Sequence, residues 1–259
     1  MSIHSRILSE AGGVPLIVLH GLLGSSRNWL SAGKMLGGSR TVVALDLPDH
    51  GESGWSDEPS FAEMAERIHR WFAEQGIGEA DWLGHSLGGK AALRIAADHP
   101  EAVRRLVLAD MFPRVYEPHH KADLETMASL DPTRLADRKE ADRALEASVP
   151  DWPLRQFLLT NLVRDPGGGF RWQVNLEGLR RNLTELAGLP FENRWPLEIP
   201  TLLVYGGKSG FVRPEDLERI GDCFTDGRAV CLPKAGHNVH VEDRDGFVAA
   251  VDEFLSESL

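Results

Sequence analysis

The sequence contains little cysteine: Cys223 and Cys231 are the only two in 259 residues. Small disulfide-stabilised secreted domains need several cysteines, so the composition excludes that class. No apolar run approaches the roughly 20 residues of a membrane-spanning helix. Residues 1–14 lack a basic segment followed by an apolar one, so no signal peptide is expected. These absences predict a protein of the reducing cytoplasm with no membrane partner.

Positive charge is also scarce. The chain has 28 Lys and Arg against 39 Asp and Glu, which gives a formal net charge of -11. Nucleic acids and anionic membrane surfaces favour clustered Lys and Arg, so neither is an expected partner. The length and the 42% apolar content are sufficient for a large core. We therefore expect a monomer or small homo-oligomer that acts on a small molecule.

Short apolar runs alternate with segments of helical periodicity along much of the chain. The runs are rich in Leu, Ile and Val, as expected for strands buried on both faces. They occupy residues 14–20, 41–45, 81–83, 105–109, 201–205 and 228–232, with a weaker edge strand at 3–8. Helices are expected at residues 27–36, 61–75, 87–97 and 245–255. This alternation predicts an α/β protein with a mostly parallel central sheet.

One stretch carries the strongest chemical signal. Residues 84–88 read Gly-His-Ser-Leu-Gly, between an apolar strand and an alanine-rich helix at 87–97. A nucleophilic serine needs a tight turn between strand and helix, where Gly84 and Gly88 avoid clashes of a Cβ atom. The helix N-terminus also faces any anion that forms beside Ser86. The pattern predicts a nucleophile elbow, and the alternative is a glycine-rich turn with a surface serine.

A serine hydroxyl needs a base to remove its proton, and the base needs an anion to orient it. Gly236 and His237 follow the last predicted strand, which makes His237 the candidate base. His240 is the competing histidine, three residues further on. His85 precedes Ser86 but is expected to point the opposite way along the strand.

Three motifs occur together: residues 84–89 (Gly-His-Ser-Leu-Gly-Gly), His20-Gly21 and Gly236-His237. Over nearly the whole chain this combination resembles the α/β-hydrolase family. The resemblance implies the α/β-hydrolase fold, with helices flanking the sheet and no cofactor or metal. It also implies an oxyanion hole made by the backbone N–H groups of Leu22 and Leu87, with His20 and Gly21 in supporting roles.

The acidic member of the site departs from the usual family pattern. That pattern places an aspartate shortly after the strand ending at Tyr205, but residues 206–209 read Gly-Gly-Lys-Ser. Asp110 is the best replacement, because it follows the strand at 105–109. The carboxyl ends of parallel strands meet at one edge of the sheet, so Asp110 is expected on the same edge as Ser86.

The YbfF-type esterases, with the ABHD-eleven-like proteins as relatives, resemble this chain at these positions. They have aspartate after the earlier strand, serine at the usual acid position, and lysine where this chain has Lys90. The resemblance implies Asp110 as the acid and Ser209 as a supporting hydrogen-bonding residue. Glu215 and Asp216 remain alternatives for the acid.

The pattern changes between residues 113 and 198. Helical stretches separated by proline and glycine are expected at residues 121–130, 138–148, 153–163 and 176–186. We interpret residues 113–198 as a helical lid inserted into a core formed by residues 1–112 and 199–259. The resembled family also has such an insertion.

Most aromatic residues of the insertion are expected to hold it to the core, with one or two lining an acyl pocket. They are Tyr116, Trp152, Phe157, Trp172, Phe191 and Trp195. Residues 167–169 are three glycines and indicate a mobile point, because no Lys-Ser/Thr follows them as in a phosphate loop. His119 and His120 are adjacent, so they do not face one metal site.

Together these features predict a serine hydrolase that cleaves short- to medium-chain carboxylic esters or thioesters through an acyl-enzyme. Ser86 would attack, His237 would transfer the proton and Asp110 would orient His237. A carbon–carbon bond hydrolase or a cofactor-free perhydrolase would use the same three residues. A ligand-sensing protein on a hydrolase scaffold is the alternative from another functional class.

Overall fold

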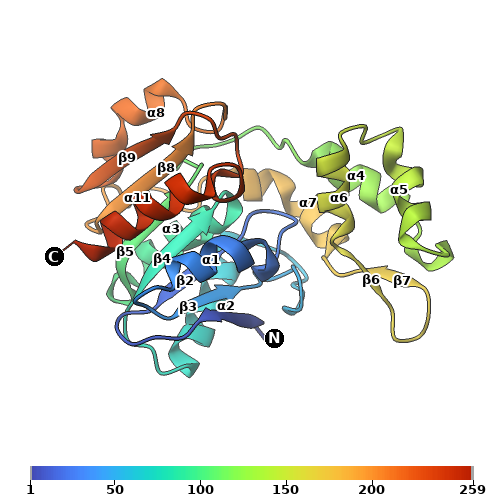
Figure 1. Cartoon of the computed structure of the whole chain (residues 1–259), viewed down its shortest axis with the longest axis horizontal. Coiled ribbons are helices and arrows are strands. Elements are labelled where there is room, and N and C mark those ends of the chain that lie inside the picture. Colours follow the sequence, from blue (N-terminus) through green and yellow to red (C-terminus); the bar gives the residue numbers. More distant parts are fainter. Residues whose placement is uncertain (1, 258–259) are drawn as a thin grey trace.

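The computed structural model describes residues 2–257 and contains a seven-stranded sheet flanked by helices (Figure 1). The strand order is β1-β3-β2-β4-β5-β8-β9. Strand β1 pairs antiparallel with β3, and every other pairing in this sheet is parallel. The strands are β1 Ser5–Ser9, β2 Leu16–Leu19, β3 Val42–Leu45, β4 Ala80–His85, β5 Val103–Ala109, β8 Thr201–Gly206 and β9 Gly227–Leu232. This mostly parallel sheet confirms the predicted fold class.

The two faces of the sheet pack against different helices. Ile17 and Leu19 belong to a hydrophobic cluster with α2 (Phe61–Glu74) and α3 (Leu87–Asp98). Leu16 and Val18 alternate with them and belong to a second cluster with α1 (Leu30–Leu36) and α11 (Arg244–Ser256). The strands are apolar throughout because both of their faces are covered.

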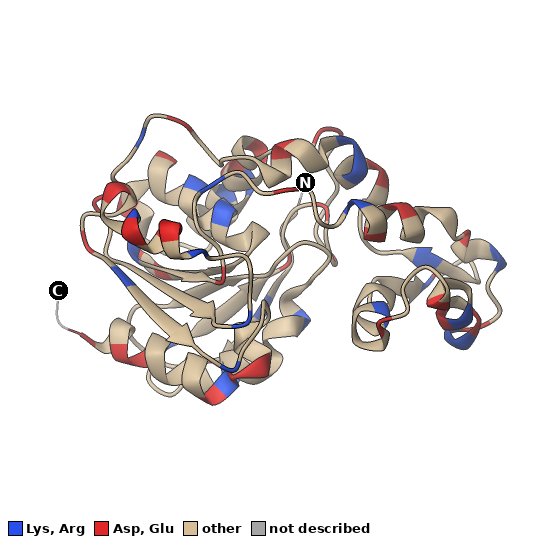
Figure 2. Cartoon of the chain, turned by 90° about the horizontal axis from the view of Figure 1, so that it is seen from above, with Lys and Arg blue, Asp and Glu red and all other residues tan. Residues whose placement is uncertain are grey.

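Shorter helices connect the main elements. They are η1 Ser26–Trp29, η2 Pro100–Ala102, η3 Pro132–Arg134, α8 Pro214–Glu218, α9 Ile220–Cys223 and α10 Val239–Glu242. No helix in the described part of the chain is long and apolar enough to cross a membrane. Lys and Arg are interspersed with Asp and Glu along the chain (Figure 2).

The turn from β4 to α3 leaves no room for larger residues around Ser86. Ser86 has φ 50 and ψ -115, in a region that L-residues seldom occupy. A Cβ on Gly84 would lie 2.3 Å from the carbonyl oxygen of Gly88, and one on Gly88 would lie 2.5 Å from that of His20. Both glycines are therefore needed for the close approach of strand, helix and loop.

The long segment between β5 and β8 includes residues 113–198, which are called the insertion below. Its helices are α4 Lys121–Ser129, α5 Arg138–Glu146, α6 Trp152–Leu159 and α7 Leu176–Ala187. Helices α4, α5 and α6 lie beside the sheet as a separate lobe, and α7 leads back toward it (Figure 1).

The helix predicted at residues 153–163 was wrong at its C-terminal end. The insertion also contains a hairpin of β6 (Leu162–Arg164) and β7 (Phe170–Trp172). Helix α6 ends at Leu159, and residues 165–169 form the hairpin turn, with Gly168 and Gly169 at positive φ. Proline and glycines therefore favour a strand reversal here rather than another helix.

Two buried side-chain amides tie the insertion to loops of the core. Asn161 Nδ2 donates to the carbonyl oxygen of Leu23 at 2.9 Å. Asn175 Nδ2 donates to Asp49 Oδ1 at 2.8 Å. Since these bonds are buried, breaking them would leave unpaired polar groups.

His20 joins the ends of β2 and β3. Its Nδ1 donates to the carbonyl oxygen of Gly21 at 2.7 Å, and its Nε2 accepts from the N–H of Leu47 at 2.9 Å. Both ring nitrogens therefore have hydrogen-bond partners when the imidazole is neutral. Burial lowers the pKa of His20 to about 3. His50 packs edge-on against His20, and burial lowers the pKa of His50 as well.

We expect the fold to lose stability on acidification, because the unfolded chain protonates His20 where the folded chain does not. The pKa of His20 falls from 6.5 to about 3 on folding. Its contribution is therefore complete above pH 6.5 and is lost progressively as the pH falls toward 3. Within that window, protonation of His20 in the unfolded chain lowers the free energy of unfolding by up to about 1.4 kcal/mol for each unit that the pH falls.

Urea unfolding of the wild type and of His20→Asn between pH 7 and pH 5 measures this effect. Asparagine keeps a donor for the Gly21 carbonyl but does not titrate. The variant should be less stable at pH 7 and should lose stability less steeply on acidification. Equal pH slopes in the two proteins would contradict the assignment.

Candidate active site

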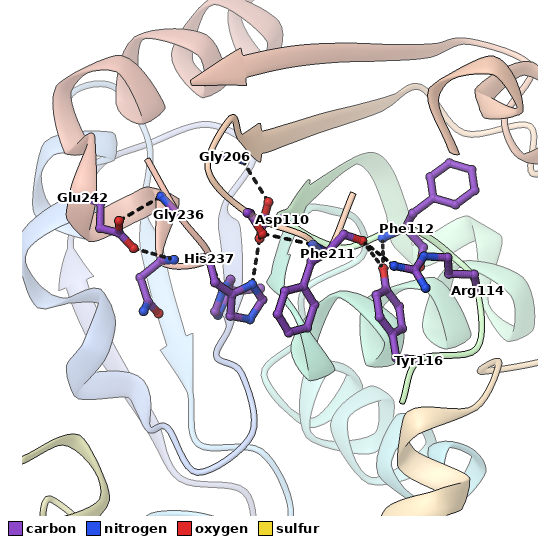
Figure 3. A network of polar contacts seen from close by, with 12 residues as sticks. Asp110, Phe112, Arg114, Tyr116, Gly206, Phe211, Gly236, His237 and Glu242 are labelled. Atoms are coloured by element: carbon purple, nitrogen blue, oxygen red, sulfur yellow. Dashed lines mark hydrogen bonds and ion pairs between the residues drawn. The ribbon is translucent and has the colours of Figure 1, made fainter. Parts of the chain in front are cut away.

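Asp110 follows β5 and lies fully buried at the carboxyl edge of the sheet. Its Oδ1 accepts from the N–H of Gly206 at 2.9 Å. Its Oδ2 accepts from the Ser209 hydroxyl at 2.5 Å and from His237 Nδ1 at 2.7 Å (Figure 3). The structure thus brings together Asp110, Ser209 and His237 from three different strand ends.

The loop that carries His237 is held on both sides of the histidine. Glu242 accepts from the N–H of Gly236 at 2.8 Å and from the N–H of Asn238 at 3.1 Å (Figure 3). Phe211 stacks on the imidazole, with ring centroids 3.8 Å apart and an interplanar angle of 19°. Glu242 and Phe211 were not identified from the sequence, because neither belongs to a motif with His237.

Two further histidines pack around His237. His85 Nε2 donates to the backbone carbonyl of His237 at 3.0 Å, and the two rings lie 4.6 Å apart. The expectation that His85 points away from the site was wrong, because β4 ends at His85 and the sharp turn at Ser86 ends the strand alternation. His240 stacks on Trp29 with ring centroids 4.1 Å apart.

These neighbours of His237 are held neutral by their surroundings. Burial lowers the pKa of His240 to about 3, with a further lowering from the charge of His237. The same two causes place the pKa of His85 well below its ordinary value. Within residues 2–257, His240 Nδ1 has no hydrogen-bond partner, so the competing histidine lacks the carboxylate that His237 has.

Asp216 and Glu215, the alternative candidates for the acid, make no hydrogen bond to His237 in the described chain. Asp216 Oδ2 accepts from Arg114 Nε at 3.1 Å and from the N–H of Arg213 at 2.9 Å. It therefore serves the first turn of α8 and an ion pair with the insertion. Glu215 is exposed on the same turn.

The loop after β2 packs against the elbow. The N–H of Gly24 donates to the carbonyl of Gly21 at 3.0 Å and closes a tight turn, in which Leu23 has φ 61. A Cβ on Gly21 would lie 3.4 Å from Ser86 Cβ, so this loop and the elbow are in close contact. The backbone N–H groups of Leu22 and Leu87 donate no hydrogen bond within the described chain. Both leucines line one cavity together with Ser86.

The first residues of the insertion support Phe211. Tyr116 Oη accepts from the N–H of Phe112 at 2.7 Å and lies 3.0 Å from the carbonyl oxygen of Phe211 (Figure 3). Arg114 Nη2 donates to the same Phe211 carbonyl at 3.1 Å, and its guanidinium lies 4.0 Å from the Tyr116 ring centroid. The insertion is thus connected to the imidazole of His237 through Phe211.

Lys90 connects the elbow helix to the end of α7. Its Nζ donates to the carbonyl oxygens of Ala187 at 2.6 Å and Gly188 at 2.5 Å. A cation at a helix C-terminus is favourable. Burial lowers the pKa of Lys90 to about 7, with a smaller contribution from the charge of Arg114.

One group in the described chain has three metal-ligand side chains close together: His69, His99 and Glu101. The two imidazoles are stacked with centroids 3.5 Å apart and an interplanar angle of 5°. Ring lone pairs lie in the ring planes, so parallel stacked rings do not converge on one ion. This cluster lies at the end of α3 remote from Ser86.

Comparisons with known proteins identify the family of this chain. The model of the alpha/beta hydrolase family matches residues 16–250. The chain is 35% identical to the sn-1-specific diacylglycerol lipase ABHD11 of Mus musculus, over 97% of this chain and 84% of that protein. It is 26% identical to esterase YbfF of Escherichia coli, over 94% and 93%. A solved structure named as a marine microorganism esterase superposes with a TM-score of 0.93 at 32% identity, covering 97% of this chain and 98% of that one.

The match to the family model spans most of the chain, and the relatives named above align along nearly its whole length. The chain therefore belongs to the α/β-hydrolase family and is of the YbfF and ABHD11 type.

Proposed function

We propose that this protein is a serine hydrolase that cleaves short- to medium-chain carboxylic esters or thioesters through an acyl-enzyme. The observation that carries the proposal is the 2.7 Å contact of His237 Nδ1 with the buried carboxylate of Asp110, beside a serine on a strained elbow. The names of the relatives, which are esterases and a lipase, support ester hydrolysis as the reaction class.

In the proposed mechanism, Ser86 Oγ attacks the ester carbonyl carbon as His237 Nε2 removes the hydroxyl proton. The negative charge that develops on the carbonyl oxygen accepts hydrogen bonds from the N–H groups of Leu22 and Leu87. His237 then gives its proton to the leaving oxygen or sulfur, and an acyl-Ser86 ester remains. Water attacks this ester with His237 again as base, which releases the acid and restores Ser86.

Asp110 keeps the proton of His237 on Nδ1, which leaves Nε2 free to face Ser86, and it stabilises the imidazolium. Ser209 supports this role through its hydrogen bond to the same carboxylate oxygen. His20 and Gly21 support the oxyanion loop, His20 through its two backbone bonds and Gly21 through the absence of a side chain.

We further propose that residues 113–198 act as a lid over the site. Tyr116, Leu183 and Leu186 from this segment line the cavity beside Ser86, and Phe157 lines a second cavity there. Tyr116 and Phe157 line these cavities, which supports the prediction that one or two aromatic residues of the insertion line an acyl pocket. A cytoplasmic location and a monomeric or small homo-oligomeric state remain predictions from the sequence.

Hydrolysis of p-nitrophenyl esters from acetate to palmitate, by wild type and by Ser86→Ala, tests the reaction. We expect turnover by the wild type and loss of turnover in the variant, because the acyl-enzyme cannot form without the hydroxyl. Activity that survives in Ser86→Ala would contradict the nucleophile. No turnover by a folded wild type would favour the carbon–carbon hydrolase, perhydrolase or ligand-sensing alternatives.

Asp110→Asn should lower kcat by about a thousand- to ten-thousand-fold, as expected when the orienting carboxylate of such a triad is lost. Asp216→Asn is the matched control, because it neutralises the other candidate acid on the same edge of the sheet. We expect Asp216→Asn to retain kcat within about tenfold. An Asp110→Asn variant that folds and keeps more than a tenth of the wild-type kcat would overturn the assignment.

A further inference from the structure

The buried imidazole of His85 is held in one tautomer beside the candidate nucleophile. His85 is the last residue of β4 and directly precedes Ser86. Its Nε2 lies 3.0 Å from the backbone carbonyl oxygen of His237. A carbonyl oxygen accepts hydrogen bonds and donates none, so the proton of the neutral ring is on Nε2. Nδ1 of His85 is therefore left with a lone pair.

This lone pair has no donor in the protein. No group in the described chain donates a hydrogen bond to His85 Nδ1. The atom is also absent from the buried polar atoms without a partner, so it is accessible. His85 lines a cavity together with Gly21, Ser86 and His237, and this cavity is large enough for water. Nδ1 is therefore a free acceptor at the candidate active site.

The glycine at position 21 shows toward which part of the site Nδ1 faces. A Cβ on Gly21 would lie 2.9 Å from His85 Nδ1 and 3.4 Å from Ser86 Cβ. A single point beside the Gly21 backbone is thus close to both side chains. Nδ1 of His85 therefore faces the same side of the elbow as the serine side chain.

The imidazole of His237 packs against that of His85. The two ring centroids lie 4.6 Å apart, with an interplanar angle of 44°. Nδ1 of His237 contacts the Asp110 carboxylate, so Nε2 is the free nitrogen of that ring. Two neighbouring rings at one cavity thus each have an acceptor nitrogen, which matches the two O–H groups of one water molecule.

The second half of the proposed mechanism needs a water molecule in a defined orientation. One O–H of this water gives its proton to His237 Nε2 while the oxygen attacks the acyl carbon. The other O–H bond stays intact and becomes the hydroxyl of the released acid. A second acceptor for that O–H fixes the rotation of the water and directs a lone pair of its oxygen at the acyl carbon.

The surroundings of His85 suit an acceptor that does not itself remove the proton. Burial places the pKa of His85 well below its ordinary value, and the charges of His237 and His240 lower it further. The ring therefore stays neutral when His237 takes up a proton, so the role of base remains with His237.

We propose that His85 positions the water that attacks acyl-Ser86, by accepting a hydrogen bond at Nδ1 while Nε2 holds the backbone of His237. This inference rests on the proposed function and concerns its second step. The first step does not need this acceptor, because the departing p-nitrophenolate of a test substrate has no O–H to donate.

The two steps are measured separately with p-nitrophenyl dimethylcarbamate, because carbamoyl-enzymes are hydrolysed slowly. With the enzyme in excess, release of p-nitrophenolate gives the rate of carbamoyl transfer to Ser86. After removal of the reagent, loss of the carbamoyl mass in intact-protein mass spectrometry gives the rate of attack by water. The ratio of the second rate to the first is the quantity to compare between variants.

Two substitutions separate the two nitrogens of His85. The amide of His85→Gln reaches as far as Nε2 and keeps a donor for the His237 carbonyl, but it has no acceptor at the position of Nδ1. We expect this variant to lower the ratio about tenfold, as for one lost hydrogen bond. His85→Asn keeps an acceptor at the position of Nδ1 and loses the donor. It should slow both steps alike and leave the ratio within about threefold of wild type, since His237 acts in both.

His240→Phe is the matched control. His240 lines the same cavity, and phenylalanine keeps a ring against Trp29 while it removes both nitrogens. This variant should keep the wild-type ratio.

An equal slowing of both steps in His85→Gln would overturn the proposal, because His85 would then act only on His237. A selective loss of the second step in His240→Phe would also overturn it and would assign the water to His240. If wild-type Ser86 takes up no carbamoyl group, the proposed function itself fails, which is a different result.

Discussion

The buried contact between Asp110 and His237 is the interaction on which the rest of the site depends. Transferring a carboxylate out of water costs several kcal/mol unless hydrogen bonds replace its hydration. Gly206, Ser209 and His237 supply those bonds: Gly206 ends β8, Ser209 follows that strand, and His237 follows β9. The loops can approach because Gly206 has no side chain: a Cβ there would lie 2.2 Å from the Gly236 carbonyl oxygen. The strand order and the glycine at position 206 are therefore both needed to bring hydrogen-bond donors to the buried Asp110 carboxylate.

The sequence was sufficient to predict the features that local rules control. The tight turn at Ser86 needs glycines at fixed offsets, and apolar runs mark buried strands, so both were recognisable without coordinates. Asp110 required one more step, namely that parallel strands end at one edge. Its placement against His237 agrees with that reasoning, while the catalytic roles remain predictions.

The features that sequence analysis missed are contacts between distant segments. Phe211 has no periodicity or motif that would indicate stacking on His237, and Glu242 resembles any acidic residue of a short helix. The hairpin at β6 and β7 was missed because three-residue strands carry too little alternation to distinguish them from a helix end. His85 was misplaced because strand alternation was extended past the residue where the strand ends.

The bond from Asn161 to the Leu23 carbonyl has a consequence for how this scaffold can be altered. The insertion is not an independent module, since one of its side chains holds the turn that presents the N–H of Leu22. Grafting a different insertion between β5 and β8 would remove the Asn161 bond and loosen that turn. Chimaeras of this fold would therefore need to carry the asparagine and its neighbouring loop as a matched pair.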